Sequence, residues 1–412
     1  MISQTSSIVD TGWRPRFLTI WTGQAFSLLG SQLVQFALIW HLTERTNSGT
    51  ALAVAGLMGV LPQAVLAPII GALVDRWSRR LIMIAADAAV ALATVGLALL
   101  FALEAIQPWH IYALLLARAV GGGFHQSAFG ASVVLLVPRQ HLARAQGMNH
   151  ALRGGMDIFA APLGALLLSI LPIQSILAID VTTAMLAIAP LLFFAIPQPA
   201  RDAEAGQPSL RRDILEGLRY VLSWPGLVIV LLMVTLINFL MTPTLSLLPL
   251  LVTRHIGGGA AELGWLNAAT GAGVVAGGAL LGLWGGFRRR VVTAQLGLIG
   301  LGLSTAALGS APPGLLTPAL AASVATGLMT PITNGSYGAM LQSIIPPELQ
   351  GRVFALIMSA AMAIAPVGLL AAGPAADVVG VRAWFWLAGL VCAGLGAAGF
   401  AIPAVMRIEE QK

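Results

Sequence analysis

Charged side chains inside long apolar segments are the residues of this sequence that could do chemistry. Arg118, Arg153, Asp157 and Asp180 each lie well inside such a segment. A charge near the centre of a lipid bilayer costs roughly 3 kcal/mol on insertion scales, so such a group usually faces a cavity or a partner. A carboxylate paired with an arginine stays ionised, whereas an unpaired one takes up a proton. The four residues therefore favour proton exchange between carboxyls and arginines.

Helical spacing places these groups on particular faces. Arg153 and Asp157 are four residues apart and share a helix face, so they form either a fixed ion pair or a pair that opens during a reaction cycle. Arg118 shares a face with His125, and it either holds an anion or carboxylate or is satisfied by helix-end carbonyls. For Asp180 the sequence favours a structural role and a functional role equally. Asp87 is expected to contact the basic loop at residues 76–80.

The composition places most of the chain in lipid. Of its 412 residues, 58% are hydrophobic and only 9% are charged, whereas a soluble domain carries about 25% charged residues. A spanning helix needs about 20 apolar residues, so the sequence predicts an all-α integral membrane protein with twelve transmembrane helices. The predicted segments are 17–41, 49–74, 81–104, 109–137, 146–171, 174–196, 227–252, 261–286, 291–311, 314–345, 352–375 and 383–406.

The distribution of arginines predicts the topology. Seventeen of the 22 basic residues fall in the ends and loops that twelve spans bring to one side, while Arg45, Arg254 and Arg382 fall on the other. Positive loops stay in the cytoplasm, so both termini are expected there. The first apolar segment is too long for a signal-peptide core and is expected to be retained.

The middle of the chain divides it into two halves. Residues 197–208 are rich in proline, alanine and charge and are typical of a linker. Residues 210–222 have apolar and basic faces that fit a helix on the inner membrane surface. The predicted organisation is a six-helix bundle at 1–196, a cytoplasmic linker at 197–225 and a second six-helix bundle at 226–412.

Several classes of function are disfavoured. The net charge of +6 is spread over many loops and forms no patch for nucleic acid. The single cysteine, Cys392, permits no intrachain disulfide. The sequence has no G-x-x-x-x-G-K-[ST], H-E-x-x-H or G-x-S-x-G pattern. We therefore expect no enzyme, no cofactor and no metal.

Residues 71–80, G-A-L-V-D-R-W-S-R-R, resemble the signature between helices two and three of the major facilitator superfamily. Arg118 followed by Gly121–Gly123 is similar to that superfamily's helix-four motif. Residues 342–354, and the first helix with Trp21 and Gln24, look like the drug-efflux group that includes macrolide and enterobactin exporters. The resemblance implies two six-helix bundles of a monomer in a bacterial inner membrane, with substrate held between them near the midplane.

The resemblance also implies a cytoplasmic gate. Its residues would be Gly71, Asp75, Arg76, Arg80 and Arg352. Gly71 would let a neighbouring helix approach closely, and Asp75 would cap the start of the eleventh helix near Arg352.

Neutral polar residues at helical spacing are the candidates for substrate contact. In the second half the predicted segments hold no acid except Glu262. Scattered polar groups among apolar walls suit an amphipathic organic molecule, although hydrogen bonds between helices are an alternative for any single residue. The candidates are Gln24, Ser31, Gln35, His125, Asn238, Thr242, Thr330, Asn334 and Tyr337.

These observations predict a secondary transporter that exports amphipathic or lipophilic compounds by alternating access in exchange for protons. Its partners would be a small-molecule substrate, protons and the lipid bilayer. Arg118, Arg153, Asp157 and Asp180 would carry the coupling. Two alternatives remain: export of a siderophore or lipid-like metabolite, and a transporter-like sensor that binds without moving solute.

Overall fold

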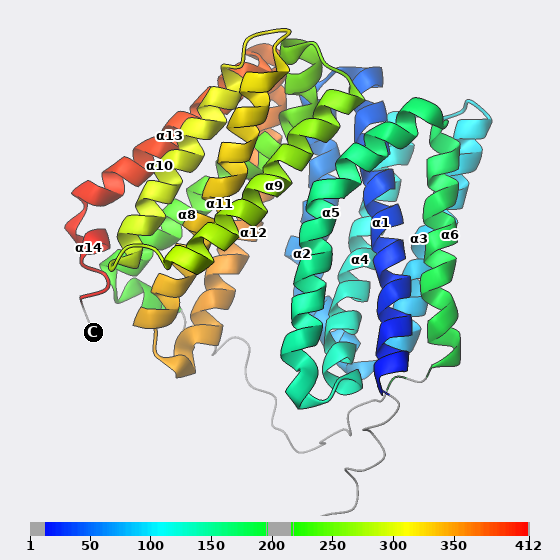
Figure 1. The fold of residues 1–412 in the computed structure, drawn as a ribbon, viewed down its shortest axis with the longest axis horizontal. Coiled ribbons are helices and arrows are strands. Elements are labelled where there is room, and N and C mark those ends of the chain that lie inside the picture. Colours follow the sequence, from blue (N-terminus) through cyan, green and yellow to red (C-terminus); the bar gives the residue numbers. More distant parts are fainter. Residues whose placement is uncertain (1–12, 195, 197–215, 217, 411–412) are drawn as a thin grey trace, which may run out of the picture. The chain divides into compact units, whose positions relative to one another are not determined.

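The computed structural model describes residues 13–194, 196, 216 and 218–410, and within these it is helical without a strand (Figure 1). The predicted linker and most of the predicted surface helix lie outside the described residues. The helices are α1 (Trp13–Thr46), α2 (Gly49–Arg76), α3 (Arg79–Ala102), α4 (Pro108–Leu136), η1 (Arg139–His141), α5 (Leu142–Ile170), α6 (Ile173–Phe193), α8 (Pro225–Leu251), η2 (Val252–Ile256), α9 (Ala260–Trp284), α10 (Arg290–Gly309), α11 (Leu316–Ile344), α12 (Pro347–Val378), α13 (Val381–Ala401) and α14 (Pro403–Met406).

Eleven of the described helices are long and apolar enough to cross a membrane. Helix α4 is as long as most of them but is not among the eleven, because Arg118, His125 and Gln126 interrupt its apolar sequence. The prediction of an all-α membrane protein is confirmed. The count of twelve spanning helices stays a prediction, which depends on α4, the helix that carries Arg118.

Local sequence explains where the helices begin and end. Proline occupies the first turn of α4, α8 and α12, where its missing N–H has no partner to lose. The hydroxyl of Ser78 caps α3. Gly285 ends α9 with a φ of 76°, a left-handed conformation that glycine adopts without strain. Glu262 caps the start of α9 by accepting a hydrogen bond from the N–H of Gly259 at 2.6 Å. Its role is therefore structural.

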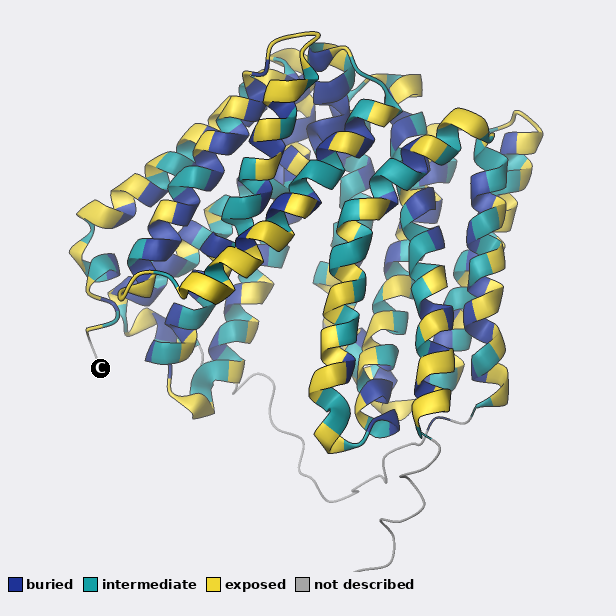
Figure 2. Cartoon of the chain, viewed as in Figure 1, coloured by how far each residue is buried: buried dark blue, intermediate teal, exposed yellow. Residues whose placement is uncertain are grey.

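Contacts divide the chain into two compact units, which we describe separately. The first holds the described residues up to Leu42 and those from Met58 to residue 196. The second holds Thr43–Leu57 and the described residues from 216 onward. In each unit the buried residues gather where its own helices meet, and exposed residues cover the outer faces (Figure 2).

In the first unit, α3 packs between α4 and α6. The arginines that follow α2 bind carbonyl groups of neighbouring helices. Arg79 is buried and donates to the carbonyl of Ala131 on α4 at 3.0 Å. Arg80 donates to the carbonyls of Leu191 and Leu192 near the end of α6. The basic loop therefore joins three helices of this unit.

In the second unit, close pairs of helices meet at glycines. A Cβ atom at Gly327 of α11 would collide with the backbone carbonyl of Thr270 on α9, and a Cβ atom at Gly273 would collide with that of Val324. Helices α10 and α13 meet in the same way at Gly302 and Gly389. Small residues let helix backbones approach closely in membranes, so these glycines set the packing distances.

Replacing Gly327 by valine should destabilise the second unit by roughly 1–3 kcal/mol, because the new side chain must push α9 away from α11. Thermal unfolding of the detergent-solubilised protein, followed by gel filtration of the heated sample, measures this loss. Gly338 on the same helix has no atom within 4 Å of the Cβ position, so Gly338→Val is the matched control and should unfold as the parent does. Equal unfolding temperatures would contradict the packing argument.

The start of α2 is attached to α12 by one carboxylate. Asp377 accepts hydrogen bonds from the N–H groups of Gly49 (2.7 Å) and Thr50 (2.9 Å), and from the hydroxyls of Ser48 (2.9 Å) and Thr50 (2.8 Å). Arg254 lies 3.3 Å from Asp377. A side chain of α12 thus caps α2, so that Thr43–Leu57 packs with the second unit.

This cap corrects the sequence analysis in one respect. The predicted eleventh segment ended at residue 375, which left Asp377 outside and Glu262 as the only acid in the second-half segments. In the structure α12 continues to Val378 and carries Asp377 in its last turn. The apolar segment ends before α12 does, because the last turn of this helix contains Asp377, the polar residue that caps α2.

Candidate functional site

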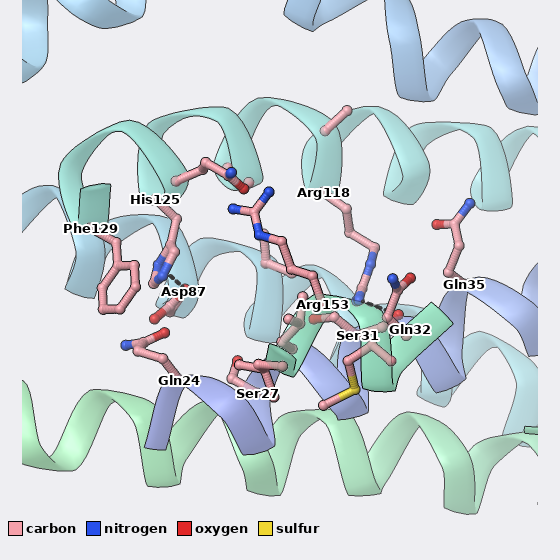
Figure 3. Close-up of a pocket in the computed structure, with 18 of the residues that line it drawn as sticks. Gln24, Ser27, Ser31, Gln32, Gln35, Asp87, Arg118, His125, Phe129 and Arg153 are labelled. Atoms are coloured by element: carbon pink, nitrogen blue, oxygen red, sulfur yellow. Dashed lines mark hydrogen bonds and ion pairs between the residues drawn. The ribbon is translucent and has the colours of Figure 1, made fainter. Parts of the chain in front are cut away.

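A cavity of about 900 Å³ lies inside the first unit. Residues of α1 to α6 line it, and they include five charged residues: Asp87, Arg118, Arg153, Asp157 and Asp180. Eight of the residues predicted for coupling or substrate contact are among them: Gln24, Ser31, Gln35, Arg118, His125, Arg153, Asp157 and Asp180. Figure 3 labels all of these except Asp157 and Asp180.

Arg118 and Asp180 form an ion pair at the wall of this cavity. Nη1 of Arg118 lies 2.6 Å from Oδ2 of Asp180, and the two side chains are only 9% and 3% exposed. Nη2 of Arg118 donates to the backbone carbonyl of Ser31 at 3.0 Å, and the Ser31 hydroxyl donates to Asp180 at 3.2 Å. The pair therefore connects α4, α6 and α1.

Helix α1 packs closely on α6 beside this pair, because residue 30 is a glycine. A Cβ atom at Gly30 would lie 3.1 Å from the Cα of Asp180 and would collide with the hydroxyl of Thr183. The Thr94 hydroxyl of α3 lies 3.4 Å from Asp180 and completes the polar contacts. Burying a charged pair is favourable only where such additional hydrogen bonds are present.

Arg153 and Asp157 both line the cavity and are exposed to it, but they form no ion pair with each other among the described residues. The guanidinium of Arg153 faces the side-chain amide of Gln126 on α4. Sequence spacing predicted that the two residues share a helix face, and both do line the cavity. Of the two alternatives, a fixed ion pair is not formed in this structure, and a pair that forms and opens during a reaction cycle stays a prediction.

His125 and Asp87 form a second pair, between α4 and α3. Nδ1 of His125 lies 2.8 Å from Oδ1 of Asp87, with the side chains 19% and 12% exposed. The ring of His125 stacks on that of Phe129, with the centroids 6.2 Å apart. Asp87 was expected to contact the loop at residues 76–80. Its partner is His125 instead, since Arg79 and Arg80 are bound to backbone carbonyls.

Several lining residues were not anticipated from the sequence. Trp21 donates its indole N–H to Asn149 of α5 at 2.8 Å, which joins α1 to α5 beside the cavity. Gln32, Gln63 and Gln126 add further amides. An isolated amide in an apolar segment carries no signal of direction by itself. Its position on the stripe that also holds Gln24 and Ser31 was the available clue for Gln32.

The candidates of the second half lie in the second unit. Asn238 and Thr330 donate to carbonyls of their own helices, at 2.9 and 2.8 Å. Thr242 is partly buried, and Asn334 is exposed. Tyr337 is 5% exposed and belongs to an apolar cluster, so its position favours packing over substrate contact. Substrate contact by Asn238, Thr242, Thr330 and Asn334 stays a prediction.

The predicted gate residues lie in both units. Asp75 and Arg76 are exposed at the end of α2, and Arg80 binds α6. In the second unit, Arg352 forms an ion pair with Glu216 at 2.6 Å. The capping of the eleventh helix by Asp75 stays a prediction. A Cβ atom at Gly71 would meet none of the described atoms of the first unit within 4 Å, and the close approach of a helix there stays a prediction.

Comparison with known proteins supports an efflux family. The family described as "Transmembrane secretion effector" matches residues 13–411. Macrolide efflux protein A of Streptococcus pyogenes is 34% identical over 385 residues, which cover 92% of this chain and 94% of that protein. The multidrug efflux pump Tap of Mycolicibacterium fortuitum is 26% identical and covers 92% and 94%.

Solved structures agree with the fold. The crystal structure of a bacterial homolog of the human lysosomal transporter Spinster superposes with a TM-score of 0.68. The match covers 97% of this chain and 98% of that one at 13% sequence identity. At that identity the likeness establishes the fold alone.

Proposed function

Because the chain belongs to the transmembrane secretion effector family of the major facilitator superfamily, we propose that it exports amphipathic organic compounds in exchange for protons by alternating access. The observation that carries this proposal is the Arg118–Asp180 pair in the wall of a polar cavity inside the first unit. The proposal places the protein in a bacterial inner membrane with both termini in the cytoplasm, in keeping with the distribution of arginines.

The residues of the cavity have different roles in the proposed coupling. Asp180 is engaged by the guanidinium of Arg118 and by the hydroxyl of Ser31, so both of its oxygens already have partners in the cavity wall. Asp157 lies exposed on the same cavity and has no guanidinium within ion-pair distance among the described residues. We therefore assign the exchanged proton to Asp157. The predicted two-bundle organisation at 1–196 and 226–412, and a monomeric state, belong to the same proposal.

Reconstitution of the purified protein in proteoliposomes tests the function. Counterflow with a panel of amphipathic compounds, including macrolides, should reveal transported substrates, and a pH gradient should drive their accumulation. Flux that ignores the gradient would remove proton coupling from the proposal. Binding without flux would favour a sensor, and a restriction to iron-chelating or lipid-like compounds would favour the other alternative.

Replacing Asp157 by asparagine should abolish accumulation driven by the pH gradient while counterflow continues. The amide keeps the size and polarity of the carboxyl but cannot exchange a proton. We expect a loss of at least about tenfold in gradient-driven uptake, equivalent to about 1.4 kcal/mol. Glu104, an exposed acid in the loop after α3, provides the control, and Glu104→Gln should transport as the parent does. Coupled uptake unchanged in Asp157→Asn would remove Asp157 from the mechanism.

A further inference from the structure

One end of the cavity holds polar atoms that lack partners. Oδ2 of Asp87 and Nε2 of Gln24 are buried, and neither has a hydrogen-bond partner among the described residues. Gln24 is only 8% exposed, and both residues line the cavity. Figure 3 shows them close to His125 and Phe129, away from the Arg118 end. A buried acceptor and a buried donor without partners are costly, so this end is suited to a ligand.

The charges of the cavity are also unbalanced. Three lining carboxyls, at Asp87, Asp157 and Asp180, face two guanidiniums, at Arg118 and Arg153. Arg118 neutralises Asp180, and Arg153 is turned toward Gln126. The lining carboxyls therefore outnumber the guanidiniums by one, and an excess of carboxyls raises the local concentration of cations.

Asp87 is the buried carboxyl that no guanidinium neutralises. Nδ1 of His125 lies 2.8 Å from its Oδ1, but neither this ring nitrogen nor Oδ2 of Asp87 has a hydrogen-bond partner among the described residues. Beside them the ring of Phe129 stacks on His125, and an aromatic face attracts a cation by roughly 0.5–2 kcal/mol. The other titratable groups on the cavity are Asp157, Asp180, Arg118, Arg153 and His150.

We propose that Asp87, Gln24 and Phe129 form a subsite for the protonated amine of the transported compound. The ammonium group donates to Oδ2 of Asp87 and lies against the ring of Phe129. The amide of Gln24 donates to an oxygen atom near the amine, and the apolar body of the compound fills the rest of the cavity. The inference rests on the proposed function, and it narrows the substrate class to amphipathic amines.

A matched pair of probes separates charge from apolar contact. The first is 3-(1-naphthyl)propylamine, which is cationic at neutral pH, and the second is its N-acetyl derivative, which is neutral with the same ring. Equilibrium binding of each to the purified full chain should show tighter binding of the amine. Asp87→Asn should weaken amine binding by about tenfold, equivalent to about 1.4 kcal/mol, and leave binding of the derivative within about twofold.

Three further variants complete the test. Asp87→Glu keeps the carboxyl and should retain the preference for the amine. It controls for misfolding, because a substitution at this position that merely disturbed the fold would lose the preference in both variants. Phe129→Leu should reduce the preference partially, and Glu104→Gln, which changes an exposed acid that does not line the cavity, should keep it. Equal binding of both probes by the parent protein, or binding of neither, would overturn the inference. Efflux in proteoliposomes reports separately on the proposed function, since an exporter of neutral compounds would pass that test and fail this one.

Discussion

Replacing Arg118 by leucine should stop efflux and lower the stability of the protein. The substitution leaves Asp180 buried at 3% exposure without its counter-charge. Removing one partner of a buried ion pair costs about 3–5 kcal/mol. Asp180→Leu should cost a similar amount, because the guanidinium of Arg118 would keep only its hydrogen bonds to Ser31 and Thr94.

The double variant Arg118→Leu/Asp180→Leu separates stability from transport. Two leucines leave no unpaired charge, so much of the lost stability should return, and the coupling energy in a double-mutant cycle should be large. Efflux should stay absent in proteoliposomes, because the double variant lacks the charges that the proposal places in the cycle. Restored efflux would make the pair purely structural. Additive losses of stability would contradict the ion pair itself.

The sequence predicted the helices well because their signal is local. Apolar length alone located most of the segments to within a few residues of the observed helices, as in 314–345 against α11 at Leu316–Ile344. It also predicted which polar residues of the first half would face inward. Gln24, Ser31 and Gln35 all line the cavity, as their spacing on one helix indicated.

The sequence did not predict which of those residues pair with each other, because pairing depends on how separate helices are rotated and placed. Spacing within α5 favoured Arg153 with Asp157, whereas the structure pairs Arg118 of α4 with Asp180 of α6 and His125 with Asp87. No periodicity within one helix contains that information. Residues near helix ends were harder still, and Asp377 went unnoticed because the apolar segment stopped before the helix did.

Replacing Asp377 by alanine should release the start of α2 from α12. The carboxylate accepts four hydrogen bonds from residues 48–50 and also contacts Arg254. Loss of a helix cap costs about 1 kcal/mol, and each hydrogen bond to a charged group contributes about 1.5–3 kcal/mol. The tight contact beneath the cap, where a Cβ atom at Gly49 would lie 2.9 Å from the Cβ of Ala376, should then open more often.

A single introduced cysteine measures that opening. The one native cysteine, Cys392, is buried and is first replaced by alanine. Ala376→Cys then places a thiol under the start of α2, where Ala376 is fully buried. In the Asp377→Ala background a membrane-impermeant maleimide should label this thiol about tenfold faster or more, as expected for an opening made easier by at least about 1.4 kcal/mol.

Two comparisons make the labelling result decisive. Asp377→Asn should give an intermediate rate, because the amide oxygen still accepts hydrogen bonds while the charge is lost. Glu348→Ala removes an exposed acid at the other end of α12 and should label as slowly as the parent. Equal labelling of the Asp377→Ala and Glu348→Ala proteins would show that Gly49 and Ala376 stay packed without the carboxylate. In that case the contact between backbones, rather than the charge, would be what holds Thr43–Leu57 to the second unit.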